Sequence, residues 1–178
     1  QEAGLPDGLL QVVNGDKESV DAILDNETIS GIGFVGSTPI AAYIYERGCA
    51  NGKRVQCFGG AKNHMIIMPD AVAVPVCEET ADKLIEKLVP KVEALKVGPY
   101  TSGDDVDYGP VVTPMAKENI QRLVQSGVDA GAELVVDGRD FSLQGYEDGF
   151  FVGPHLFDRV TPDMEIYQKE IFGPVLST

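Results

Sequence analysis

Three short motifs in this chain contain residues that could bind a ligand. Ser37 follows an apolar run and opens a helix, where unpaired N–H groups and the positive end of the helix dipole favour a bound anion. Gly59 and Gly60 follow another apolar run, and glycine permits a close backbone approach or a positive φ there. Glu170, in the motif Glu-Ile-Phe-Gly-Pro-Val, has an acceptor-only side chain that suits the two hydroxyls of a ribose.

Each motif also has a purely structural interpretation. Ser37 could do no more than cap its helix, because serine is a common capping residue. Gly59 and Gly60 could form a tight turn, and a glutamate such as Glu170 is ordinarily a solvated surface carboxylate. The residue types alone therefore leave a binding site and an ordinary surface both open.

Apolar periodicity predicts that strands and helices alternate in the first part of the chain. Strands are predicted over residues 9–13, 32–35, 54–58 and 64–68. Asp16 predicts the cap of one helix, and residues 36–39 predict the start of a second helix that Gly48 ends. This alternation predicts an α/β fold with a parallel sheet covered on both faces, a common setting for dinucleotide binding.

The remainder of the chain predicts a second group of elements. A strand over residues 72–76 precedes a helix whose apolar stripe consists of Ala81, Leu84, Ile85, Leu88 and Val92. After a loop rich in Gly, Asp and Pro, Thr113 and Pro114 predict the start of another helix, which Gly131 ends. Short strands are predicted over residues 134–136, 150–152, 155–157 and 175–178.

The composition is that of a globular protein without affinity for polyanions. The chain has 178 residues, 43% of them hydrophobic, which is enough for a core in one domain or two small lobes. Its 28 acidic and 14 basic residues give a formal net charge of −14, which argues against nucleic acid as a partner. There is no apolar run of membrane-spanning length and no basic start of a signal peptide. We expect a cytoplasmic protein or the mature form of a mitochondrial matrix protein, with no membrane partner.

The three cysteines do not predict a disulfide framework, a zinc site or a nucleophile. Cys49, Cys57 and Cys77 are odd in number and form no C-x-x-C pair. An active thiolate needs a helix start, a cation or a metal. Cys49 lies at a predicted helix end, Cys57 lies in an apolar strand, and two carboxylates oppose the helix start beside Cys77.

The histidines and a cluster of aspartates predict no further site. His64 and His155 stand alone in apolar surroundings, so both are expected to be structural. Asp104, Asp105 and Asp107 could bind a hard cation such as Ca²⁺, but they lack the ligand alternation and turn glycine of an EF-hand. A solvated loop without a metal is the preferred prediction.

The motifs, in their order along the chain, resemble the aldehyde dehydrogenase superfamily. The resemblance is carried by Phe-Val-Gly-Ser-Thr at 34–38, Gly-Gly-Ala-Lys-Asn-His at 59–64 and Glu-Ile-Phe-Gly-Pro-Val at 170–175, and it extends over essentially every residue. Lys-Asn-His at 62–64, the Gly-Ser-Thr-Pro turn at 36–39 and the run at 158–164 are most similar to the methylmalonate-semialdehyde dehydrogenase branch. That branch passes its acyl group to coenzyme A.

The resemblance implies an incomplete aldehyde-dehydrogenase-like fold that contributes cofactor contacts. Residues 1–71 would be the last part of the NAD-binding domain, and residues 72–178 would be part of the catalytic domain. The implied cofactor-binding residues are Gly36 and Ser37 at the NAD diphosphate, Gly59 beside the nicotinamide, Glu170 at the nicotinamide ribose and Phe172 near the ring. We therefore expect the helix that begins at Ser37 and the carboxylate of Glu170 to converge on one NAD.

The resemblance also bears on the fate of the acyl group. In hydrolytic members, a glutamate two positions before the first of the paired glycines activates water, and here Cys57 stands at that position. A thiol substitutes poorly for a carboxylate base at neutral pH, so transfer to coenzyme A is favoured. A small semialdehyde substrate and a homo-oligomeric complete enzyme are implied as well.

The chain lacks parts that this chemistry needs. In the superfamily, a helix and the loop that bears the nucleophilic cysteine would stand between the strands predicted over residues 64–68 and 72–76. Here only three residues join those strands. We therefore assign no catalytic residue and expect no dehydrogenase activity from the chain alone. The alternatives are a non-catalytic remnant and a hydrolytic aldehyde dehydrogenase.

Overall fold

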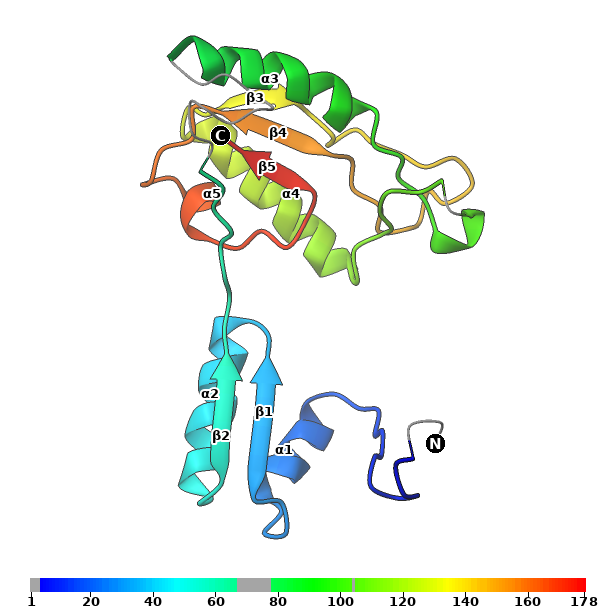
Figure 1. Cartoon of the computed structure of the whole chain (residues 1–178), viewed down its shortest axis with the longest axis vertical. Coiled ribbons are helices and arrows are strands. Elements are labelled where there is room, and N and C mark those ends of the chain that lie inside the picture. Colours follow the sequence, from blue (N-terminus) through cyan, green and yellow to red (C-terminus); the bar gives the residue numbers. More distant parts are fainter. Residues whose placement is uncertain (1–3, 67–77, 104) are drawn as a thin grey trace. The chain divides into compact units, whose positions relative to one another are not determined.

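Two units make up the computed structural model, which describes residues 4–66, 78–103 and 105–178 (Figure 1). One unit comprises residues 1–60 and the other residues 61–178. The domain boundary expected after Ala71 falls among residues outside the described ranges, so it stays a prediction. The strand expected over residues 72–76 lies outside the described residues as well.

The first unit is a strand–helix–strand motif preceded by a helix. Its elements in chain order are α1 (Lys17–Asp25), β1 (Gly31–Val35), α2 (Thr38–Ala50) and β2 (Arg54–Phe58). β1 and β2 run parallel, with Ile32 opposite Val55. A parallel pair needs a crossover connection, and α2 supplies it. The strands predicted over residues 32–35 and 54–58 and the helix starts predicted at Asp16 and residues 36–39 are confirmed.

The helices of this unit pack on one face of the two-stranded sheet. Along both strands, exposed residues alternate with half-buried ones, as the period of two in a strand requires. Ile32 and Val55 belong to the half-buried set, and both would contact a Cβ atom placed on Gly48 in α2. Val35 and Phe58 belong to the opposite set and are exposed. The sheet is thus covered on one face by the described residues of this unit.

Gly48 does not end α2, contrary to the sequence prediction. The helix continues to Ala50, and Gly52 follows it with φ +72°, the left-handed conformation that favours glycine after a helix. A Cβ atom at position 48 would lie 2.7 Å from Cγ2 of Val55. Gly48 therefore allows close packing of the helix on β2, a role that sequence reasoning mistook for a stop signal.

Residues 9–13 do not form the predicted strand. They have no regular structure, and the side chains of Leu9, Leu10, Val12 and Val13 are 70 to 82% exposed. An isolated extended segment gains no ladder hydrogen bonds, so apolar residues alone do not make a strand. Asp16, directly after this stretch, accepts a hydrogen bond from the Glu18 N–H and caps α1 as predicted.

The second unit combines helices with a mixed three-stranded sheet. Its elements are α3 (Glu78–Glu93), a 3₁₀ turn (Tyr100–Ser102), α4 (Pro114–Asp129), β3 (Glu133–Val136), β4 (His155–Asp158), α5 (Glu165–Gln168) and β5 (Val175–Ser177). β4 is central: it pairs antiparallel with β3 and parallel with β5. The α/β class is confirmed, and the parallel pairing predicted for the first part of the chain is present in β1 and β2, whereas this second sheet is mixed.

Apolar residues of α3 and α4 build two buried clusters around β4. The larger cluster contains Ile120, Leu123 and Val124 of α4 together with Phe157, and the smaller one contains Val92 of α3 together with Leu156. Because Leu156 and Phe157 are neighbours in a strand, their side chains point to opposite faces. The apolar stripe predicted for α3 and the apolar face of α4 are therefore the surfaces that pack on the two faces of this sheet.

Three details of the second unit differ from the sequence prediction. Residues 150–152 are not a strand, because Gly153 and Pro154 follow and proline cannot donate to a ladder. The four-residue helix α5 was not predicted, since one turn is too short to show a period. No strand forms over residues 64–66, the described part of the strand predicted over residues 64–68.

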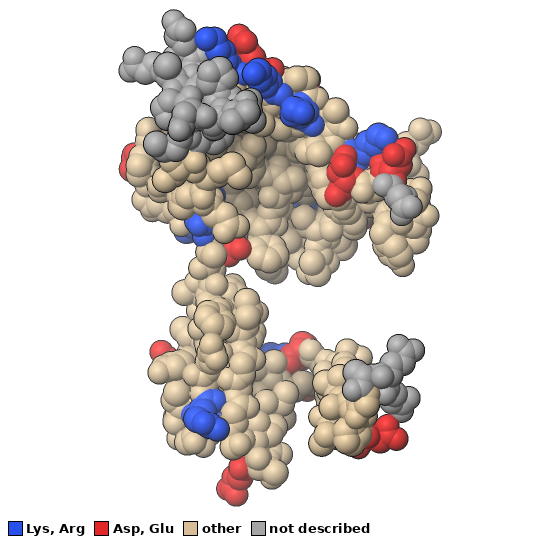
Figure 2. Space-filling view, viewed as in Figure 1, with Lys and Arg blue, Asp and Glu red and all other residues tan. Residues whose placement is uncertain are grey.

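Charged residues of both signs share the outer side of α3. Figure 2 shows Lys and Arg side chains along this helix, and the exposed Lys83, Lys87 and Lys91 alternate with Glu86 and Glu93. Such a mixture does not create the single-sign field that would attract a polyanion. Among the helices in the described ranges, none has the length and apolar character needed to cross a membrane.

Candidate functional site

The turn from β1 to α2 brings a glycine and an unpaired serine hydroxyl to one end of the sheet. Gly36 donates its N–H to the Phe58 carbonyl (3.1 Å) and so extends the ladder by one residue. A Cβ atom on Gly36 would lie 2.5 Å from Cζ of Phe34, so a larger residue would displace that ring. Residues 31–36 match the spacing G-x-G-x-x-G, but Gly31 and Gly33 lie inside β1. Only Gly36 occupies the strand-to-helix turn where a dinucleotide fingerprint would act.

Ser37 precedes α2 in the capping position without using its side chain as a cap. Its backbone is extended (φ −64°, ψ 145°), and its hydroxyl makes no capping hydrogen bond. The helix has 13 residues, so the N–H groups of its first turn and its dipole present a partial positive charge. The alternative interpretation, in which the Ser37 hydroxyl serves only to cap the helix, is therefore not supported by the geometry.

Gly59 lies against the same helix start. The N–H of Gly60 donates to Oγ1 of Thr38 (3.0 Å). A Cβ atom on Gly59 would lie 2.8 Å from Oγ1 and 3.3 Å from Cα of Thr38. The structure thus brings together Gly36, Ser37 and Gly59, three of the five predicted cofactor-binding residues, at the carboxyl ends of two parallel strands.

A pocket between α1 and α2 begins one turn beyond Ser37. It has a volume of about 410 Å³ and is lined by Lys17, Val20, Ile40 and Tyr43. Val20 and Ile40 supply apolar walls, and the Tyr43 ring adds an aromatic one. Sequence reasoning missed this pocket, because it depends on the contact of two helices that are separate in the sequence.

Polar groups fix the Tyr43 wall of this pocket. The Tyr43 hydroxyl donates to Oδ1 of Asp21 (2.6 Å), and the Lys17 ammonium donates to Oδ2 of the same carboxylate (2.6 Å). These hydrogen bonds, from Lys17 first and from Tyr43 second, hold the pKa of Asp21 below its usual range. Arg47 also donates to the Tyr43 oxygen. The ring is thus oriented by charged neighbours on both helices.

Cys57 lies next to the end of β2, opposite Phe34 in the parallel register. Its side chain is half-buried, and it is not in a disulfide. Cys49 is exposed, and Cys77 lies outside the described residues. The prediction that Cys57 occupies an apolar strand is confirmed.

The other two predicted cofactor-binding residues belong to the second unit. Oε2 of Glu170 accepts a hydrogen bond from the Ala61 N–H (3.0 Å). Lys62 donates from Nζ to the carbonyls of Ile166 (2.6 Å) and Lys169 (3.2 Å), which ties residues 61–62 to α5 and the segment after it. Burial lowers the pKa of Lys62, and the nearby Glu170 charge opposes that effect. The segment that bears Glu170 is thus anchored next to the Gly-Ala-Lys-Asn-His motif.

Phe172 has a strained backbone and an exposed ring. Its φ is +58°, although only glycine adopts this region readily, and its side chain is 82% exposed. Such conformations cost about 1–3 kcal/mol and persist where the surroundings impose them, often at functional sites. An exposed phenylalanine in this conformation is more consistent with a ligand contact than with a core role.

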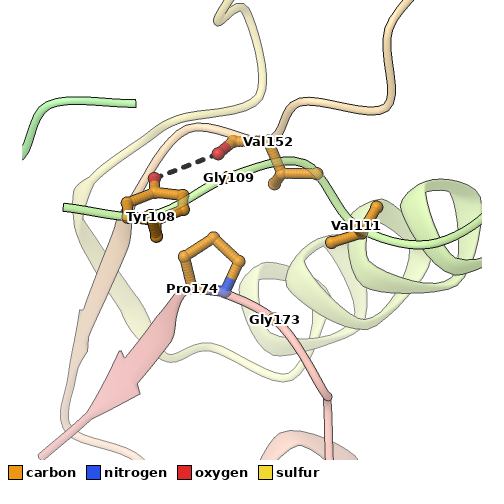
Figure 3. A pocket seen from close by; sticks show the side chains of 6 residues that line it. All are labelled: Tyr108, Gly109, Val111, Val152, Gly173 and Pro174. Atoms are coloured by element: carbon orange, nitrogen blue, oxygen red, sulfur yellow. Dashed lines mark hydrogen bonds between the residues drawn. The ribbon is translucent and has the colours of Figure 1, made fainter. Parts of the chain in front are cut away.

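A second apolar pocket lies behind the Phe172 segment. Its volume is about 380 Å³, and it is lined by Tyr108, Gly109, Val111, Val152, Gly173 and Pro174 (Figure 3). The Tyr108 hydroxyl donates to the Val152 carbonyl (3.0 Å), as the dashed line in Figure 3 marks. Burial raises the pKa of Tyr108 to about 12, so this phenol stays neutral and keeps the bond.

The histidines and the aspartate loop have structural partners or surroundings. His64 is exposed and packs against the Tyr167 ring at 5.3 Å between centroids, whereas His155 is buried. Asp105 pairs with the Lys96 ammonium (3.0 Å) and Asp107 accepts the Lys96 N–H (2.8 Å). In the described ranges, no group of three or more acidic, histidine or cysteine side chains is arranged to hold a metal ion.

The parallel strand–helix–strand unit, with its glycines and free serine at the helix start, has the geometry of a nucleotide-binding motif. The chain belongs to the aldehyde dehydrogenase family, whose model matches residues 1–74 and 73–178.

Its relatives include semialdehyde dehydrogenases. It is 52% identical to the malonate-semialdehyde dehydrogenase of Pseudomonas aeruginosa over 98% of its length and 40% of that protein. It is 46% identical to the mitochondrial, acylating methylmalonate-semialdehyde dehydrogenase of Arabidopsis thaliana over 98% of its length and 32% of that protein. The chain therefore spans two fifths or less of these curated relatives.

Solved structures agree with this assignment. A structure described as a methylmalonate-semialdehyde dehydrogenase of Sinorhizobium meliloti 1021, complexed with NAD, matches 99% of this chain and 41% of its own. The TM-score is 0.90 and the identity is 58%. The incomplete aldehyde dehydrogenase fold expected from the sequence is confirmed.

Proposed function

We propose that this chain is the cofactor-holding part of an NAD-dependent semialdehyde dehydrogenase that transfers its product to coenzyme A. The observation that carries the proposal is the arrangement of Gly36, Ser37 and Gly59 at the start of α2, where the serine hydroxyl is not used as a cap. The NAD complex of the S. meliloti relative supports the choice of cofactor. Malonate or methylmalonate semialdehyde is the proposed substrate, since the relatives carry those names.

The residues present fit the parts of NAD. The Ser37 hydroxyl and the first-turn N–H groups of α2 would bind the diphosphate, because they offer donors without a full positive charge. The pocket beside Val20 and Ile40 has apolar walls and a volume suited to the adenine ring. The free acceptor atoms of Glu170 would bind the ribose hydroxyls, and the exposed Phe172 would flank the nicotinamide. The bound cofactor would accept the hydride that leaves the substrate.

The isolated chain lacks the residues needed for turnover. Its alignment with the P. aeruginosa relative runs over 200 positions, although this chain has 178 residues, and the family model matches it in two segments that meet near Ala71. Both findings support the interpretation that the relatives carry residues here that this chain does not have. Within the superfamily, the nucleophilic cysteine is expected at this place.

We expect no NADH when the purified chain is incubated with malonate semialdehyde, NAD and coenzyme A. Absorbance at the wavelength of NADH measures this directly. A full-length relative serves as the positive control for the substrates. Clear turnover by the 178-residue chain would refute the assignment of no catalytic residue.

A Ser37→Asp variant should bind NAD at least tenfold more weakly than the unchanged chain. Aspartate still suits the start of a helix, so α2 should remain stable, but its carboxylate would repel the diphosphate. Isothermal calorimetry is the suitable measurement, because the chain has no tryptophan to report on binding.

The matched control for this experiment is Ser37→Gly, which removes the hydroxyl without adding charge and should weaken binding less than Ser37→Asp. Equal NAD affinities for the aspartate variant and the unchanged chain would contradict a diphosphate site at α2. Absence of any NAD binding by the unchanged chain would favour the alternative of a non-catalytic remnant.

Cys57 separates the acylating proposal from a hydrolytic enzyme. In a complete enzyme, Cys57→Glu should shift the product from acyl-CoA toward free acid, because a carboxylate activates water better than a neutral thiol does. Chromatography of the two products gives the ratio. Cys57→Gln, whose side chain is similar in size to glutamate but has no basic group, is the control. An unchanged ratio in the glutamate variant would contradict the argument from Cys57 for the acylating branch.

The remaining partners are also proposals. In the complete protein we expect a homo-oligomer that acts on a small semialdehyde and coenzyme A, without a nucleic-acid or membrane partner. Relatives occur in bacteria and in mitochondria. The bacterial cytoplasm is the proposed compartment, with the mitochondrial matrix as the alternative.

A further inference from the structure

His155 is a buried ionisable residue in the central strand of the second unit. Its side chain is 1% exposed, and neither ring nitrogen has a hydrogen-bond partner among the described residues. The carbonyls of Pro174 and Gly153 are close enough to favour a proton on the ring, but they fall short of hydrogen-bond geometry. A buried imidazole without a partner is stable only as the neutral ring, since burial of an unpaired charge is costly.

The backbone of His155 holds the segment that carries Glu170 and Phe172. The His155 N–H donates to the Pro174 carbonyl (2.9 Å), and His155 stands opposite Val175 in the β4–β5 ladder. On its other side, a Cβ atom on Gly173 would lie 2.5 Å from Cδ1 of Ile120 in α4. The Gly-Pro turn after Phe172 is therefore confined between α4 and β4 at the position of the histidine.

Few charges are available to compensate a proton on His155. Asp137, after β3, favours the charged ring, whereas Arg139 opposes it. Asp137 already receives the Arg139 guanidinium at 2.9 and 3.0 Å from Nε. Tyr108 stays neutral, and Val92 of α3 and Leu95, which follows that helix, are apolar and line a pocket together with His155. Protonation would thus place a new cation beside a carboxylate that is already paired.

We infer that His155 is a proton-sensitive latch, which holds the Phe172–Val175 segment against β4 while the ring is neutral and releases it when the ring is protonated. This inference rests on the proposed function, because the released segment carries the proposed NAD contacts Glu170 and Phe172. It adds a regulatory property to that site: acidification should loosen the cofactor contacts of the second unit without a change in any residue that touches the cofactor.

The direction of the pH dependence follows from burial. Desolvation lowers the pKa of His155 below its ordinary value of 6.5. In the closed state the Phe172–Val175 segment is paired with β4, and in the opened state it is released. The opened state takes up a proton near pH 6.5, while the closed state does so only at lower pH. The closed state therefore loses stability as the pH falls below 6.5. For one proton, the opened population can rise by at most tenfold per pH unit. Below the pKa of the closed state, the dependence ends.

Carboxylates of the same unit act in a different pH range. Hydrogen bonds from Arg122 and Lys169 lower the pKa of Glu165 to about 2, and those of Arg139 lower the pKa of Asp137. Groups with a lowered carboxyl pKa stabilise the fold above the ordinary carboxyl range and lose that effect below it. The interval from about pH 5 to 6.5 therefore separates the two histidines of this unit from these carboxylates, and the variants at position 155 distinguish His155 from His64.

NMR of the unliganded 178-residue chain tests the latch. The chain has two histidines, so a His64→Gln variant assigns the two sets of ring signals. In a titration from pH 7.5 to 5, we expect the His155 ring of the closed state to take up its proton below its ordinary pKa. Hydrogen exchange of the His155 amide, corrected for the intrinsic rate, should accelerate by up to tenfold per pH unit below 6.5, and the signals of Phe172 and Gly173 should change in parallel.

Two variants that cannot be protonated at position 155 provide the controls. In His155→Leu, and in His155→Gln as a polar substitute, the acid-dependent acceleration should be absent between pH 5 and 6.5. Persistence of the same acceleration in a folded variant would overturn the inference, as would a His155 ring that titrates near 6.5 in the unchanged chain without any change at residues 172–173. The measurement uses no NAD, so it can fail while the proposed function stands, and the Ser37 experiment can fail independently of it.

Discussion

In a Phe157→Ala variant, the free energy of unfolding of the second unit should fall by about 3–5 kcal/mol, the range for removal of a buried aromatic side chain. Phe157 is fully buried in the larger cluster, where it meets α4 from the centre of the sheet. Its Cε1 and Cζ atoms would lie 3.1 Å from a Cβ atom at position 127, so the ring and Gly127 are closely fitted. Alanine at position 157 would leave a cavity between β4 and α4.

Native-state hydrogen exchange at the amides of α4 and β4 measures this loss, because it reports on the second unit separately from residues 1–60. Leu176→Ala in β5 is the control, since that side chain is 46% exposed and its truncation should cost far less. A domain of this kind is stable by only about 5–15 kcal/mol in total, so Phe157→Ala could remove a large part of the unit's stability. Equal losses of unfolding free energy in the two variants would contradict a dominant contribution of the larger cluster to the stability of this unit.

Local signals in the sequence were sufficient for elements that have their own cap and period. The β1–α2–β2 motif followed from two apolar runs around a Ser-Thr-Pro helix start, and α4 followed from Thr113, whose hydroxyl accepts the Ala116 N–H as a cap should. The failures occurred where tertiary context decides. Residues 9–13 are as apolar as β1 but have no ladder partner in the described part of the chain, and residues 150–152 are followed by Gly153 and Pro154.

The candidate site was predictable to the same extent. Gly36, Ser37 and Gly59 each follow a strand that the sequence predicts, and they lie together because parallel strands end at the same edge of a sheet. The contact between Glu170 and the Ala61 N–H joins positions 109 residues apart, and no local pattern indicates such a pair. The positive φ of Phe172 and the burial of His155 likewise depend on neighbours that are distant in the sequence. Whether Ser37 and Glu170 bind the same NAD stays a prediction.

A Gly138→Ala variant should destabilise the second unit by about 3 kcal/mol, at the upper end of the range for overpacking. A Cβ atom on Gly138 would lie 2.4 Å from the carbonyl carbon of Gly153 and 2.6 Å from the Pro154 oxygen. Gly153 shows the reciprocal restriction, since its own Cβ atom would lie 2.8 Å from Cα of Gly138. The obstacles are backbone atoms rather than flexible side-chain ends, so the chain itself would have to move.

The movement would reach the proposed cofactor segment, because Gly153 and Pro154 lead directly into His155 and the β4–β5 ladder. For a chain of this size, about 3 kcal/mol corresponds to a fall in melting temperature of roughly 10 °C, which calorimetry resolves. Gly109→Ala is the matched control, since the closest atom to a Cβ there is the Gly98 oxygen at 3.7 Å, an ordinary contact. If both alanine variants melted at the same temperature, the backbone contact between Gly138 and Gly153 would not be what positions the start of β4, and the Phe172 segment would need another anchor.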